Sequence, residues 1–161
     1  MASRSPISRC QKMRGFVRVR PPIFFLITHL EFLMASTLRS RFENDDWLKL
    51  LKPNRQEKIE NEWKKLKVVN MEIDRILATQ FCDKRDAILK SGTHPSAMTY
   101  NQAEQELRRV EELRNHVAHA GDIASTEAKA LQAVKTVKLA RQWIMYLTDL
   151  LAARSHSPST A

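Results

Sequence analysis

Apolar residues recur along most of this chain at the three- and four-residue spacing of amphipathic helices. The pattern predicts helices over residues 22–42, 44–51, 54–69, 71–90, 101–119 and 125–153, with the fourth segment divided into two helices near Cys82 and Asp83. Residues 23–34 are apolar almost all the way round, which predicts a central, buried first helix with His29 as a hydrogen-bonded core residue. Gly92 and Pro95 mark residues 91–100 as the clearest loop.

Residues suited to helix ends stand near the predicted boundaries. They are Pro22 as a first-turn proline, Asn44 as a cap, Asn101 with Glu104 as a pair resembling a capping box, Gly121 as a stop signal and Ser125 as the last cap. Three glycines in the whole chain are too few for the tight turns of a β-sandwich or barrel. We therefore predict an all-α fold, a single bundle of five to six helices.

Three predicted helices supply the core of this bundle, through residues 23–34, 107–117 and 137–151. The stripes on the last two are Ala103, Leu107, Val110, Leu113 and Val117, and Val137, Ala140, Ile144, Leu147 and Leu151. Trp47, Trp63 and Trp143 each lie on an apolar stripe, so we expect core or interface positions for them and not base-stacking platforms.

The net charge of +9 is concentrated at one end of the chain. Residues 1–20 hold six Lys and Arg and no acid, which leaves 21 bases against 18 acids in the rest. Composition therefore supports nucleic-acid binding only weakly. We expect residues 1–21 to be a disordered basic leader, with Met13 a plausible later start, residues 22–153 to be the bundle, and residues 154–161 to be a disordered tail.

The basic leader leaves other targeting classes to consider. A mitochondrial transit peptide has a similar composition and stays open. A signal peptide is disfavoured because His29 and Glu31 interrupt the apolar run, which is also shorter than the ~20 residues that cross a bilayer. Cys10 and Cys82 make neither a disulfide framework nor a four-cysteine zinc site. We therefore expect a cytoplasmic protein with no membrane partner.

One stretch carries an unusual set of reactive side chains, residues 114–119. At 100° per residue, Arg114 falls within the apolar stripe, whereas Asn115, His116 and His119 lie on the polar face. An arginine among core positions needs an anion, a partner chain or an ion pair with a carboxylate such as Glu31 or Asp83. A snorkelling arginine is the simpler alternative.

The spacing of Arg114, Asn115 and His119 resembles the Arg-x-x-x-x-His motif of the HEPN superfamily, helical bundles that include metal-independent ribonucleases. A polar residue after the arginine is typical of that family. Residues 23–39, Trp47 and the Phe81-Cys82-Asp83 turn are similar to HEPN-like domains found after CBS-domain pairs, although no CBS pair is present here. The branch paired with nucleotidyltransferase antitoxins has a tyrosine where this chain has Gly121, so tyrosine modification is not expected.

The resemblance implies an endoribonuclease with a toxin or defence role and an antitoxin or regulatory protein as partner. His119 would be the general base or acid, Arg114 would hold the scissile phosphate, Asn115 would orient one of them, and His116 would add a polar substrate contact. Arg114 and His119 are about 140° apart on a straight helix, so the family's shared site in a homodimer is expected. RNA supplies its own 2′-hydroxyl nucleophile, so neither metal nor cofactor is required.

Two alternatives use the same residues. HEPN-like domains also act as non-catalytic RNA- or nucleotide-binding or dimerisation modules, in which the motif persists as an ion pair. An Arg114 closed off by a carboxylate favours this module, and an exposed His119 in a basic cleft favours the enzyme. His116 and His119 could instead share a metal, but no convincing third and fourth ligands lie nearby in the sequence.

Overall fold

The computed structural model describes residues 9–69, 72–119 and 123–155, and within these ranges the chain is all-helical with no strand. The predicted all-α bundle is thereby confirmed. The described residues form five α-helices and two short 3-10 helices, one on each side of α2 in the chain. Their bounds are α1 Arg9–Arg41, η1 Asp46–Leu50, α2 Pro53–Val69, η2 Arg75–Ala78, α3 Phe81–Lys90, α4 Tyr100–Ala118 and α5 Glu127–Ser155. Residues 1–8 of the expected leader and 156–161 of the expected tail lie outside the described residues.

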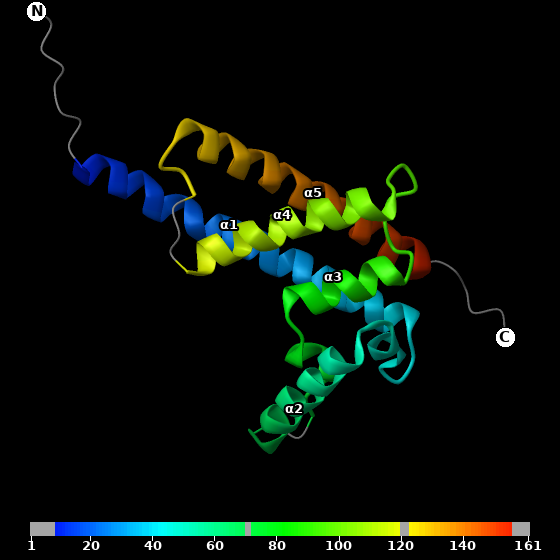
Figure 1. Cartoon of the computed structure of the whole chain (residues 1–161). Coiled ribbons are helices and arrows are strands. Elements are labelled where there is room, and N and C mark those ends of the chain that lie inside the picture. Colours follow the sequence, from blue (N-terminus) through cyan, green and yellow to red (C-terminus); the bar gives the residue numbers. More distant parts are fainter. Residues whose placement is uncertain (1–8, 70–71, 120–122, 156–161) are drawn as a thin grey trace, which may run out of the picture.

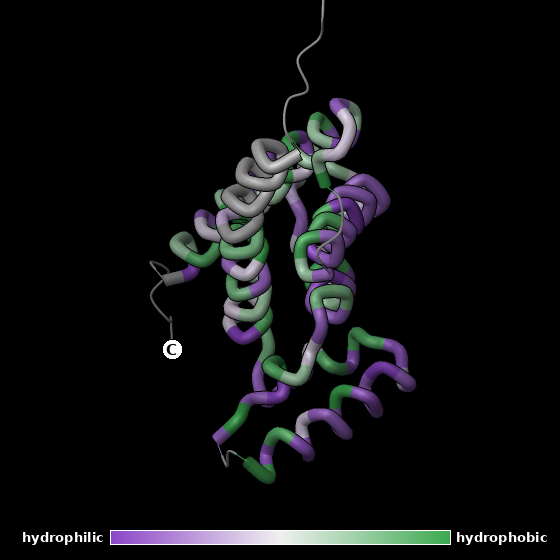
Figure 2. Tube along the Cα trace, turned by 90° about the vertical axis from the view of Figure 1, so that its left-hand side faces the viewer, coloured by the Kyte–Doolittle hydropathy of each residue, from purple (hydrophilic) through white to green (hydrophobic). Residues whose placement is uncertain are grey.

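Helix α1 is the central element of the bundle and packs against α3, α4 and α5 (Figure 1). Helices α4 and α5 also pack against each other, as do α3 and α4. Helix α2 lies to one side of this bundle and is predominantly hydrophilic along its length (Figure 2). Its main neighbour is η2, so we call residues 46–78 the side arm.

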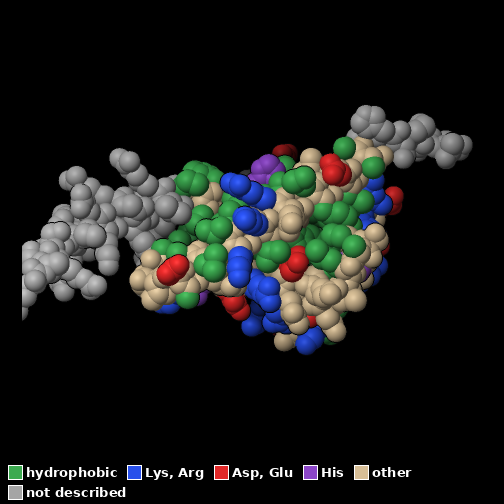
Figure 3. All heavy atoms as spheres, turned by 90° about the horizontal axis from the view of Figure 1, so that it is seen from above, with side chains coloured by type: hydrophobic (Ala, Val, Ile, Leu, Met, Phe, Trp, Pro, Cys, Tyr) green, Lys and Arg blue, Asp and Glu red, His purple; other side chains and the backbone are tan. Residues whose placement is uncertain are grey.

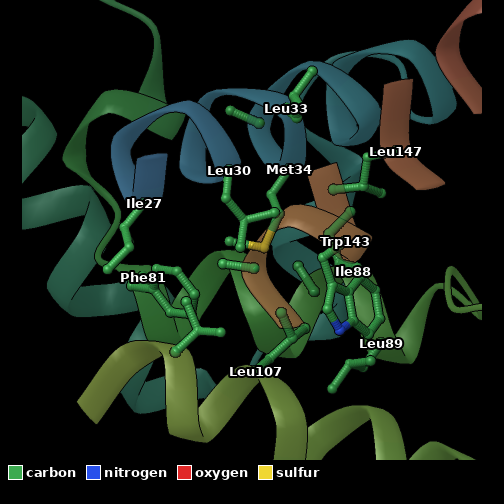
Figure 4. Packing of buried hydrophobic residues seen from close by; sticks show 14 of the residues in the cluster. Ile27, Leu30, Leu33, Met34, Phe81, Ile88, Leu89, Leu107, Trp143 and Leu147 are labelled. Carbon is green, nitrogen blue, oxygen red and sulfur yellow. The ribbon is translucent and has the colours of Figure 1, made fainter. Parts of the chain in front are cut away.

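The hydrophobic core forms where α1, α3, α4 and α5 meet, with Leu30 and Met34 of α1 facing Ile88, Leu107 and Trp143 (Figure 4). All five residues of the α4 stripe are buried, as the spacing predicts. On α5, Ala140 and Leu147 are buried and Val137, Ile144 and Leu151 are partly buried against the core. The indole Nε1 of Trp143 donates to Glu106 Oε2 at 2.9 Å, which satisfies its polar atom in the core.

Helix α1 differs from its prediction in two respects. It begins at Arg9 and continues through Pro22, the residue at which we expected it to start. It is also buried on one side only, because Phe24, Phe25 and Phe32 are 46%, 69% and 63% exposed. His29 is exposed between Phe25 and Phe32, so its prediction as a core residue was wrong. The three helices that pack against α1 cover only part of its circumference, so some of its apolar side chains remain exposed.

By length and composition alone, Pro22–Arg41 would be apolar enough to cross a membrane. This is weak evidence, since core helices and signal sequences share the property, and 44% of this stretch is buried inside the bundle.

Several helix ends lie one or two residues from the predicted caps. Asp45, in the left-handed region at φ 64°, precedes η1 in place of Asn44. Thr99 and Gln102 form the capping box of α4, because the threonine hydroxyl and glutamine side chain exchange hydrogen bonds with the backbone there. Thr126 Oγ1 accepts from the Lys129 N–H, so α5 is capped one residue after Ser125. Gly121 lies outside the described residues.

The break inside residues 71–90 falls at Thr79 and Gln80, before the predicted position at Cys82. Asp83 therefore lies in the first turn of α3, where its Oδ2 accepts from the Gln80 N–H at 2.9 Å. The Phe81-Cys82-Asp83 segment is helical and not a turn. An acidic side chain at this position satisfies one of the unpaired N–H groups at the helix start.

Ion pairs attach the side arm to the bundle. Arg55 at the start of α2 contacts both oxygens of buried Asp83, at 2.8 and 2.7 Å. Within the side arm, Arg75 pairs with Glu60 and with Asp45, the residue that precedes the arm, and its guanidinium lies 4.1 Å from the centre of the Trp63 ring.

The three tryptophans occupy different surroundings. Trp47 and Trp143 are buried, as expected of core aromatics. Trp63 is half-buried within the side arm, and its Nε1 donates to the Ile73 carbonyl at 2.8 Å.

Candidate functional site at the end of helix α4

Arg114 lies at the contact between α4 and α1, where it forms an ion pair with Glu31. Its Nε is 2.7 Å from Glu31 Oε1, and its side chain is 37% exposed. Of the two carboxylates that the sequence offered as partners, the structure selects Glu31, because Asp83 is engaged by Arg55. Arg114 is therefore held in place by a carboxylate of its own chain.

Lys84 of α3 brings a second positive charge to the same carboxylate. Its Nζ is 3.9 Å from Glu31 Oε2 and donates to the Thr79 carbonyl at 3.0 Å. Burial lowers the pKa of the Lys84 ammonium, and the nearby Glu31 carboxylate partly offsets that effect. Arg114 and Lys84 together outnumber Glu31, so this three-residue cluster carries excess positive charge when all of its groups are ionised.

His119 and Asn115 lie on the solvent-exposed side of the end of α4. His119 is the C-cap residue that follows the last residue of α4, Ala118, and its backbone N–H donates to the Asn115 carbonyl at 3.0 Å. Asn115 Oδ1 accepts from Arg114 Nη1 at 3.4 Å, a long contact between neighbouring residues. Asn115 thus contacts the arginine, whereas the described side chains of Arg114 and His119 form no hydrogen bond with each other.

His116 belongs to a separate environment, a groove between α4 and the first half of α5. The groove encloses about 190 Å³. Its lining residues are Arg109, Glu112, Leu113, His116, Ile123, Lys129, Gln132, Ala133 and Thr136. The groove was not predicted. Arg109 and His116 are seven residues apart on one face of α4 and could have been paired from the sequence, but the residues from α5 depend on tertiary packing.

The described side chains include no cluster of three or more His, Cys, Asp and Glu residues that could hold a metal ion. His116 and His119 are both exposed near the end of α4, and the described chain brings no further ligand of these types to complete a site with them. The end of α4 therefore brings together the Arg114 and Lys84 cations, the Glu31 carboxylate between them and, apart from these, the exposed imidazole of His119.

No family model matches this chain, and no significant match was found among curated proteins or solved structures.

Proposed function

We propose that this protein is a metal-independent endoribonuclease of HEPN type that works as a homodimer. The observation that carries the proposal is the presence, near one end of α4, of an exposed imidazole on His119 and of an arginine, Arg114, in a cluster of excess positive charge. Cleavage by the 2′-hydroxyl of RNA needs a group that moves protons and a group that stabilises negative charge on phosphorus. Histidine and arginine are the side chains suited to these two tasks.

A second protomer supplies what one protomer lacks. The side chains of Arg114 and His119 leave the helix in different directions, so each phosphate would meet the arginine of one copy and the histidine of the other. Exposed apolar side chains offer a surface for association. Phe24, Phe25 and Phe32 lie on α1, the helix that Arg114 contacts, and Leu131, Val134 and Met145 are exposed on α5. Hydrophobic groups of this kind, with Lys and Arg between them, are visible from above in Figure 3.

A second candidate function is a non-catalytic module that binds RNA or nucleotides or mediates dimerisation. The Arg114–Glu31 ion pair favours it, because a carboxylate already occupies one edge of the guanidinium. In this alternative Arg114 joins α4 to α1, and its replacement lowers the free energy of unfolding without removing any catalytic activity.

Incubation of the purified protein with single-stranded RNA in EDTA separates the two candidates. The enzyme predicts cleavage that falls about 100-fold or more in His119→Ala, because one general acid or base contributes about 10²–10⁴-fold. DNA of the same sequence should stay intact. His94→Ala is the matched control, since among the described residues the ring of this loop histidine hydrogen-bonds only to the neighbouring Pro95 carbonyl.

The outcomes discriminate clearly. Equal, slow RNA loss with wild type and His119→Ala would assign the activity to contamination and favour the module. Cleavage abolished by EDTA would contradict a metal-independent mechanism. A monomer by light scattering at micromolar concentration would contradict the shared site.

A further inference from the structure

The groove between α4 and α5 combines an apolar floor with a basic rim. Leu113 and Ile123 are buried at its floor and Ala133 is half-buried beside them. The two helices that form its walls run alongside each other in Figure 1. A concave apolar surface with a few polar groups at its edge is the usual form of a small-molecule site.

The rim carries more positive than negative groups. Arg109, His116 and Lys129 all line the groove, and Glu112 is the one acid that lines it within the described part of the chain. The side chains of Arg109 and His116 have no hydrogen bond or ion pair with any other described residue. Arg55, Arg85 and Arg114, in contrast, are all paired with carboxylates. An arginine left without a carboxylate beside an apolar hollow is placed to receive an anionic ligand.

The dimensions restrict the size of that ligand. About 190 Å³ is less than the ~300–1,000 Å³ of sites for drug-sized molecules, so the groove suits one planar base with an attached charged group. Thr136 is 3% exposed at the inner wall, and its hydroxyl donates to the Gln132 carbonyl at 2.9 Å, which leaves its oxygen able to accept a hydrogen bond. An apolar floor, a hydroxyl acceptor and a cationic rim match a base with its phosphate.

We propose that this groove binds one nucleotide of an RNA strand, with the base on Leu113 and Ile123 and the phosphate between Arg109 and Lys129. The inference rests on the proposed action on RNA and adds a subsite to it. His116 connects the groove with the proposed cleavage site, because it lines the groove and lies one helical turn before His119. The bound nucleotide is therefore a neighbour of the cleaved one, and it positions the strand without taking part in proton transfer.

Calorimetric titration with AMP, UMP, adenosine and ribose 5-phosphate tests the subsite directly. A nucleotide should bind more tightly than either of its parts. Arg109→Gln and Lys129→Gln should each weaken nucleotide binding about tenfold, as expected for loss of one charge-assisted contact, and leave adenosine unaffected. Ala133→Leu fills the floor with a side chain that suits a helix and should abolish binding of both AMP and adenosine. Lys138→Gln, on an exposed lysine of α5 outside the groove, is the control and should change nothing.

The results separate failure of the subsite from failure of the ribonuclease. Ribose 5-phosphate binding as tightly as AMP would overturn the subsite in favour of a simple anion site. Nucleotide binding that is absent, or unchanged in Ala133→Leu and Arg109→Gln, would also overturn it. RNA cleavage that depends on His119, with a KM unaltered by Ala133→Leu, would leave the enzyme standing and remove the subsite. Groove-dependent AMP binding without RNA cleavage would keep the site and discard the enzyme.

Discussion

The ion pair between Arg55 and Asp83 should be the strongest of the ion pairs that attach the side arm to the bundle. It joins the first turn of α2 to the first turn of α3, and the Asp83 side chain is 3% exposed whereas that of Arg55 is 29% exposed. Arg55→Met removes the charge and keeps much of the side-chain volume. The buried carboxylate would then retain the Gln80 N–H but lose both guanidinium contacts.

The expected cost follows from this burial. Removing one partner of a buried pair typically costs about 3–5 kcal/mol, and partial access of water to the Arg55 site favours the lower end, about 3 kcal/mol. Asp83→Asn should cost less, about 1–2 kcal/mol, because the arginine left behind is partly solvated. The pair of Lys65 and Glu62 on α2, with side chains 70% and 56% exposed, is the matched control. Lys65→Met should cost less than about 0.5 kcal/mol.

Urea denaturation followed by far-ultraviolet circular dichroism measures these differences. With a slope of about 1–3 kcal/mol per molar urea, a loss of 3 kcal/mol shifts the midpoint by about 1 M or more. A shift for Arg55→Met no larger than that for Lys65→Met would refute the reasoning. A larger loss for Asp83→Asn than for Arg55→Met would show that the helix-capping contact, and not the buried charge, determines the stability.

Three further outcomes are expected. Burial, with a contribution from Asp83, raises the pKa of the Cys82 thiol above its ordinary 9.0, so in a Cys10→Ser background its alkylation rate should reach half-maximum at a higher pH than that of free cysteine. Burial lowers the pKa of Lys84 below 10.5, so between the lowered pKa and 10.5 the unfolded chain binds more protons than the folded chain. The free energy of unfolding should therefore rise with pH in that window, and it should rise more in wild type than in Lys84→Met. Phe32→Ser should change the unfolding free energy of the monomer by less than about 0.5 kcal/mol and weaken dimerisation in light scattering.

Helix α4 illustrates what a sequence alone can predict. Its stripe from Ala103 to Val117 is buried as expected, because a regular spacing on a polar background determines which face of a helix is apolar. Its N-cap differs from the prediction by two residues, because Thr99 and Asn101 are both good caps and only backbone geometry decides between them.

Helix α1 shows where such reasoning ends. When residues are apolar all the way round, periodicity does not indicate which ones the neighbouring helices will cover. The exposure of Phe25, His29 and Phe32 is therefore a consequence of tertiary packing. The partner of Arg114 was undetermined for a related reason, since choosing Glu31 over Asp83 requires knowing that Arg55 reaches Asp83 first.

The ion pair of Arg114 does not by itself decide between an enzyme and a module. A carboxylate at Nε fixes the orientation of the guanidinium, and a fixed cation stabilises developing charge better than a mobile one. The same carboxylate also reduces the charge available to a phosphate. Lys84 offsets this reduction, because its ammonium shares Glu31 and restores excess positive charge to the cluster. Arg114 is therefore both anchored and still electrostatically suited to an anion, and the decisive property is whether the His119 of a second copy reaches the same phosphate.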